Sequence, residues 1–167
     1  TFCMTVLPKW LKNMYIHEFA LAGKLLTNID RHKYLGVTMQ NNGKDDADIR
    51  QQIKGLYARG NLIIKHFKHC SMDVKLQLFK SYCVSFYCSY LWISYSQESI
   101  RKIEVAYKNI YRSLMHVKRG QTTEHMVQND ICNFSSVIRK LSYGFQKRVT
   151  ESVNVLISTL ISSVFFH

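Results

Sequence analysis

Residues 98–117 read ESIRKIEVAYKNIYRSLMHV, and in this stretch the apolar and basic side chains separate onto two sides of a helix. The apolar side chains recur at helical spacing, at Ile100, Ile103, Tyr107, Ile110 and Leu114. The basic side chains fall on the outward side, at Arg101, Lys102, Lys108 and Arg112. The stretch therefore predicts an amphipathic helix with one buried face, and Gly120 is expected to be its C-cap.

Two further helices are predicted upstream of this one. Asp45, Asp46 and Asp48 stand where they can cap a helix and complement its dipole, and apolar residues then follow at helical spacing to around His69. Ser71 is expected to cap the next helix, with an apolar face that runs from Val74 to Leu91. The uncharged stretch 81–97 is too short and too polar to span a membrane, so it is interpreted as a buried helix.

Downstream, Thr122 or Thr123 is expected to cap a short helix that ends near Asn129, and Ser135 a longer one. The tail at 153–166 is uncharged but interrupted by polar residues, which favours a core helix over a membrane anchor.

The first part of the chain has short apolar runs instead of helical periodicity. Phe2–Leu7 and Tyr34–Met39 are predicted strands, and Phe19–Leu21 is a possible third. Asn41-Asn42-Gly43 supplies a turn that serves as a domain boundary. The predicted fold class is mainly α, with a small β-hairpin segment at the N-terminus and then a helical bundle of four to five helices.

Charge and cysteine content restrict the functional classes. The 167 residues carry 23 Lys and Arg against 11 Asp and Glu, a net charge of +12, which points first to nucleic acid and second to an anionic membrane surface. The five cysteines are odd in number and none are spaced as Cys-x-x-Cys. Neither a disulfide framework nor a zinc ribbon is indicated, so an intracellular compartment is expected, nucleus or cytoplasm.

Several blocks of sequence, in order, resemble the reverse transcriptases of non-LTR retrotransposons. The blocks are AGK at 22–24, HKYLGV at 32–37, DIR at 48–50, SMDVK at 71–75, KSY at 80–82 and YCSYLW at 87–92. Cys88 stands where that family usually has glycine, and the resemblance covers roughly residues 22–114. It implies that 1–43 is the end of a polymerase palm with primer-grip strands, 44–120 a thumb-like three-helix unit and 121–167 a helical extension.

The resemblance also implies a parent enzyme, an RNA-directed DNA polymerase that uses two divalent metal ions, Mg in most such enzymes, held by aspartates. The Asp-Asp turn of that family precedes the Tyr-Leu-Gly signature, whereas Asp45-Asp46 follows it and is interpreted as helix-capping. No catalytic residue, metal ligand or cofactor is therefore expected in this chain. The expected partners are an RNA/DNA primer-template and the rest of the polymerase, its palm and fingers, and no membrane.

Two alternatives stay open at this point. The chain can be a non-catalytic helical binding protein or remnant derived from a retrotransposon. It can also be a membrane-associated helical protein, which the uncharged tail and the basic charge would allow.

Candidate nucleic-acid contacts fall in two sets. Tyr34, Leu35 and Gly36 match the primer grip, the hairpin that holds the primer terminus in that family; the alternative is an ordinary strand with Leu35 inward and a glycine bulge. Basic residues form the second set and would contact phosphates, unless they are simply solvated. They are Arg50, Lys54, Arg59, Lys65 and Lys68 on the first helix and Arg101, Lys102, Lys108 and Arg112 on the third.

Overall fold

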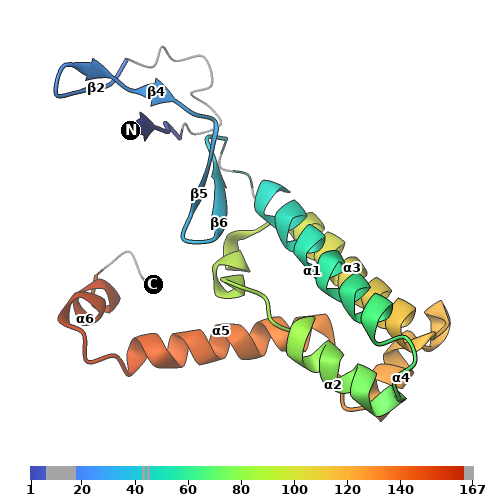
Figure 1. The fold of residues 1–167 in the computed structure, drawn as a ribbon. Coiled ribbons are helices and arrows are strands. Elements are labelled where there is room, and N and C mark those ends of the chain that lie inside the picture. The colour runs from blue at the N-terminus through green and yellow to red at the C-terminus, as the bar shows by residue number, and fades with distance from the viewer. Residues whose placement is uncertain (7–17, 43, 45, 164–167) are drawn as a thin grey trace.

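The chain is mainly helical with a few short strands near its N-terminus, which confirms the predicted class (Figure 1). The computed structural model describes residues 1–6, 18–42, 44 and 46–163. This part contains six α-helices, one more than the predicted maximum of five, because the tail forms a separate short helix. They are α1 (Asp46–His66), α2 (Met72–Tyr82), α3 (Gln97–Met115), α4 (Thr122–Gln128), α5 (Phe134–Thr150) and α6 (Val155–Ile161).

The strands form three separate two-stranded pairs. The pairs are β1 (Phe2–Cys3) parallel to β4 (Thr27–Asn28), β2 (Ala20–Leu21) antiparallel to β3 (Lys24–Leu25), and β5 (Arg31–Tyr34) antiparallel to β6 (Val37–Gln40). The single strand predicted for Tyr34–Met39 was wrong, because the chain reverses at Leu35 and Gly36, both of which have positive φ. Of the predicted strand Phe2–Leu7, the first two residues form β1 and Leu7 lies outside the described residues.

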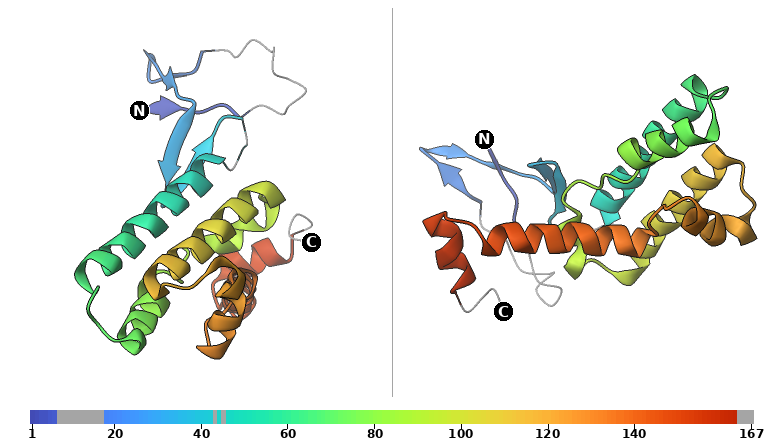
Figure 2. Two further views of the ribbon diagram at one scale, coloured as in Figure 1. Left: turned by 90° about the vertical axis from the view of Figure 1, so that its right-hand side faces the viewer. Right: turned by 90° about the horizontal axis from the view of Figure 1, so that it is seen from below.

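Helices α1 and α3 lie side by side and form the centre of the helical part (Figures 1 and 2). Their close approach depends on Gly60, which is buried in α1 against Ile110 of α3. A Cβ at Gly60 would lie 2.5 Å from Ile110 Cγ2, closer than side chains pack. A glycine here costs helix propensity but lets the two helix backbones come together.

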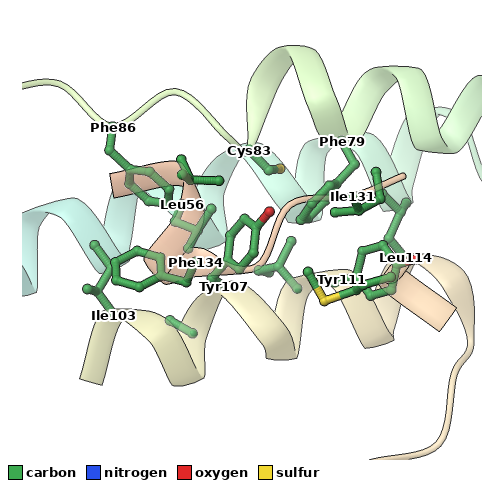
Figure 3. Close-up of a cluster of buried hydrophobic side chains, with 14 of the residues drawn as sticks. Leu56, Phe79, Cys83, Phe86, Ile103, Tyr107, Tyr111, Leu114, Ile131 and Phe134 are labelled. Atoms are coloured by element: carbon green, nitrogen blue, oxygen red, sulfur yellow. The ribbon is translucent and has the colours of Figure 1, made fainter. Parts of the chain in front are cut away.

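The core is built around aromatic rings from four segments (Figure 3). The Tyr107 ring lies 5.2 Å from that of Phe79, 6.0 Å from Phe86 and 5.9 Å from Phe134, measured between centroids. The Tyr107 hydroxyl donates a hydrogen bond to the Cys132 carbonyl at 2.9 Å, so its polar atom is satisfied where it is buried. Tyr107 is thus a core residue, as predicted, and burial raises the pKa of its hydroxyl.

The helix predicted from Ser71 to Leu91 ends at Tyr82. Cys88 has a φ of 55°, a left-handed conformation that an α-helix excludes, and a 3₁₀ helix, η2 (Ser89–Ser94), follows it. The reading of residues 81–97 as one buried helix was therefore wrong. Val74, expected inward, is 42% exposed, whereas Cys83 and Trp92 are buried.

Three predicted caps were also wrong, each by a few residues. His116, not Gly120, takes the left-handed position after α3. Thr122 is the first residue of α4 and its hydroxyl donates back to the Lys118 and Arg119 carbonyls. Asn133 caps α5 in place of Ser135, because its side-chain oxygen accepts from the Ser136 N–H.

The end of the chain leaves the core. Helix α5 begins with buried Phe134 and Val137 and then extends past the bundle to α6 (Figure 2). Val155 and Leu156 of α6 are 74% and 75% exposed, so the prediction of a core helix was wrong for the described part of the tail. Within the described residues, none of the helices combines the length and apolarity needed to cross a bilayer.

Changing Gly60→Ala should lower the free energy of unfolding by up to about 2 kcal/mol. The overlap with stiff, buried Ile110 costs about 1–3 kcal/mol and outweighs a gain of about 1 kcal/mol in helix propensity. Urea unfolding followed by circular dichroism would measure this. Gly55→Ala is the matched control on the same helix, since its Cβ would make only an ordinary 3.4 Å contact. Equal stability of the two variants would contradict a close contact between α1 and α3 at Gly60.

Candidate nucleic-acid interface

The tip of the β5–β6 hairpin presents two apolar side chains to solvent. Tyr34 is 60% exposed and Leu35 72% exposed, so the alternative of an inward Leu35 was wrong. Positive φ at both Leu35 (44°) and Gly36 (85°) is the pattern of a type I′ turn. A Cβ on Gly36 would overlap the Tyr87 ring, so this glycine gives Tyr87 its place beside the turn.

A buried carboxylate joins this hairpin to the start of α1. Asp48 is 1% exposed, and its Oδ1 accepts from the Thr38 N–H at 3.1 Å. In a two-residue hairpin this N–H points away from the paired strand, so it needs an acceptor from elsewhere. Asp48 Oδ2 accepts from the Tyr95 hydroxyl at 3.2 Å, which ties the segment after η2 to the same point. The hairpin is thereby oriented relative to the helices.

The predicted basic residues of α1 do not share one face. At roughly 100° per residue, Arg50, Lys54 and Lys65 fall within about 60° of each other, whereas Arg59 lies about 180° from Arg50. Arg50, Lys54 and Lys65 are exposed, and Arg59 is half-buried. Lys68 is exposed and lies beyond the end of α1. The outer face of α1 therefore carries two separated basic sites, one near each end.

Lys102 of α3 adds positive charge close to the first of these sites. It pairs with Glu98 at 2.8 Å on the helix surface. The hydrogen bond and negative charge of Glu98 raise the pKa of Lys102, and the positive charge of Arg50 opposes that rise. Arg50 and Lys102 are thus near enough to act on one another across α1 and α3.

The other basic residues of α3 line a shallow depression of about 390 Å³ at the α3–α4 junction. Four basic residues and one acidic residue line it, together with Val105, Thr122 and Thr123; the charged residues are Arg101, Lys108, Arg112, Arg119 and Glu104. Lys108 pairs with Glu104 at 2.7 Å, which leaves three arginines as the excess charge. Arg112 also donates to the Asn109 side chain, and Asn109 donates to the Tyr57 hydroxyl of α1 at 3.2 Å.

The structure therefore brings together only part of the predicted set. Arg50, Lys54 and Lys102 gather where α1 and α3 begin, and Arg101, Lys108 and Arg112 gather at the depression. Arg59 instead lines a different depression with Arg148 and Tyr87, neither of which was predicted as a site residue. Arg59 and Arg148 each follow a helical glycine by four residues, a spacing that is visible in the sequence but weak as a signal.

Among the described residues, no group of three or more His, Cys, Asp or Glu side chains is placed to hold a metal ion.

No protein-family model matches this chain, and neither the curated proteins nor the solved structures contain a significant match to it.

Replacing Asp48 with alanine should lower the free energy of unfolding by about 1–3 kcal/mol, because the buried Thr38 N–H loses its acceptor. Hydrogen exchange at the Thr38 amide should accelerate in the same variant. Asp48→Asn keeps an acceptor of the same shape and is the matched control, with a smaller loss expected in both measurements. Unchanged exchange at Thr38 in the alanine variant would show that Asp48 does not hold the hairpin.

Proposed function

We propose that this chain is the primer-grip and thumb part of an RNA-directed DNA polymerase, and that it holds a primer-template rather than carrying out the chemistry. The observation that carries the proposal is the hairpin tip. Tyr34-Leu35-Gly36, which resembles the primer-grip signature of reverse transcriptases, forms an exposed turn that Asp48 ties to the first turn of α1, and Arg50 and Lys54 are exposed on the next turns of that helix.

The conformation of Leu35 supports a binding role for the tip. A non-glycine residue in the left-handed region costs roughly 1–2 kcal/mol, and type I′ turns prefer asparagine or glycine there. Leu35 bears this cost while its side chain is 72% exposed. Strained residues with exposed apolar side chains are typical of binding sites. The fold is less stable with such a residue, but the side chain is available to contact a ligand.

The charge distribution supports nucleic acid as the ligand. Arg50 and Lys54 on α1 are exposed, and Lys102 on α3, which pairs with Glu98, lies near Arg50. Phosphate contacts of this kind position a duplex without reading its sequence. The proposed role is therefore affinity and positioning with no preference for particular bases.

Exposed apolar residues on the strands support the second proposed partner, the remainder of the polymerase. Phe19, Leu21 and Leu25 are 49%, 58% and 63% exposed. Isolated two-stranded pairs are marginally stable in water, and an apolar face on them favours packing against further structure. A palm that packs against this part of the chain would cover these side chains.

In such a parent enzyme the two divalent ions would be held by aspartates of the palm and would supply the charge stabilisation for nucleotidyl transfer. The residues of this chain would act by geometry, since a primer end that is misplaced loses the near-attack arrangement on which the transfer depends.

Reversing two charges together, Arg50→Glu and Lys54→Glu, should weaken binding to an RNA/DNA primer-template hybrid about tenfold or more. If both side chains contact phosphates, the slope of log K against log salt should also become shallower by roughly 1.4–1.8. Fluorescence anisotropy over a salt series would measure both effects.

The control for this pair is Arg139→Glu with Lys140→Glu, an equal charge change at exposed positions of α5. It should weaken binding much less, because a general loss of net charge acts weakly at a distance when salt is present. Equal weakening by the two double variants would remove α1 from the proposed interface.

Changing Leu35→Asn should stabilise the fold by about 1 kcal/mol while it weakens primer-template binding. Asparagine tolerates the left-handed turn, whereas the apolar contact of Leu35 with the nucleic acid would be lost. Thermal unfolding and anisotropy on the same preparation separate the two effects. Leu62→Asn, which removes a leucine of α1 that is 59% exposed, should leave binding unchanged. Full binding by Leu35→Asn would contradict the grip role of the tip.

A further inference from the structure

A second depression, of about 460 Å³, lies between α1, the segment before and within η2, and α5. Its lining combines two arginines with amide, hydroxyl and aromatic side chains, and none of the residues that line it is acidic. Arg59 and Arg148 line it together with Ser89, Tyr87 and Tyr90. This composition distinguishes it from the depression beside α3, where Glu104 offsets part of the positive charge.

The two arginines are arranged alike on two different helices. Arg59 Nη1 lies 3.4 Å from the position that a Cβ of Gly55 would occupy, and Arg148 Nη1 lies 3.6 Å from that of Gly144. Each guanidinium therefore lies along its own helix over a residue that has no side chain. Neither arginine forms an ion pair among the described residues. Two unpaired cations on one concave surface repel each other, which an anion between them would relieve.

Two polar atoms at this site have no hydrogen-bond partner although they are buried. They are Arg59 Nε and Ser89 Oγ, and Ser89 as a whole is 1% exposed. Buried donors without acceptors cost roughly 1–3 kcal/mol each and are uncommon in folded proteins. Both can donate to an acceptor oxygen, and both belong to residues that line the depression.

Aromatic rings stand at the same depression. Tyr87 is 60% exposed and lies beside Gly36 of the hairpin turn. Tyr90 is held in place by stacking on Phe145 of α5, with ring centroids 3.9 Å apart and planes 7° apart. An exposed tyrosine next to arginines provides a surface on which a nucleobase stacks.

We propose that this depression binds a phosphate group carried by a nucleotide unit, with Arg59, Arg148 and Ser89 on the phosphate and Tyr87 against the base. The proposal rests on the proposed function, and deepens it by naming a phosphate subsite beside the grip. Arginine suits phosphate because its planar fork donates two parallel hydrogen bonds, and it stays charged at all ordinary pH values. A small carboxylate could pair with the two arginines but would have no base to stack on Tyr87.

The test uses the full 167-residue chain and isothermal titration with three probes: inorganic phosphate, dAMP, and a short single-stranded DNA with a 5′-phosphate. The intact chain should bind dAMP more tightly than inorganic phosphate, since only dAMP carries a base. Arg148→Gln should weaken dAMP binding about tenfold to a hundredfold, the effect of losing a hydrogen bond to a charged group. Arg148 is exposed, so this variant should fold normally.

Two further variants separate binding from folding. Ser89→Ala should weaken dAMP binding severalfold without lowering the melting temperature, because Ser89 Oγ makes no hydrogen bond that the fold could lose. Arg139→Gln, at an exposed site on the same helix as Arg148, should bind dAMP as the intact chain does. Equal dAMP affinity in Arg148→Gln and the intact chain would overturn the proposal, and so would equal affinity of the intact chain for dAMP and inorganic phosphate.

The oligonucleotide identifies the source of the phosphate. Binding that is tighter than that of dAMP and depends on Arg148 assigns the site to a nucleic-acid strand, whereas equal binding assigns it to a free nucleotide. The two proposals can also fail separately. If hybrid binding depends on Arg50 and Lys54 but dAMP binding does not depend on Arg148, only the proposal of the phosphate subsite is contradicted. If dAMP binding depends on Arg148 but the hybrid does not bind, only the grip and thumb role fails.

Discussion

The close packing of α1 on α3 is the contact on which the rest of the structure depends. Gly60 lets the two backbones approach at Ile110, and this brings the Tyr107 side of α3 within reach of α2 and the start of α5. Phe79 and Phe134 then close the core around one tyrosine ring. A core of this kind fills space efficiently, and it leaves little freedom in how the helices can be placed.

The same packing determines what the outer surface offers. The inner faces of α1 and α3 pack against each other, so most of their basic side chains lie on the outer faces. Arg50 thereby comes near Lys102, although 52 positions separate them in the chain. Asp48 then uses the first turn of α1 to orient the hairpin.

The elements that the sequence predicted well are those with strong local signals. The apolar period of α3 and the acidic first turn of α1 were sufficient to predict these two helices. An amphipathic pattern and a favourable first turn both act within the helix itself. Prediction failed between Tyr82 and Ser96, where an apolar run was taken for a continued helix. Cys83, Phe86 and Trp92 in that run are buried, yet Cys88 adopts a left-handed conformation that no composition rule anticipates.

By itself, the sequence determined that this chain is basic and mainly helical, because these properties depend on residue type and short-range period. Only the tertiary structure decided which basic residues act together. Arg59 was grouped with Arg50 by position in the chain, yet it faces Arg148 and Ser89 across a depression formed by three distant segments. Such groupings depend on how helices pack, and packing is a property of the whole core, which no local pattern encodes.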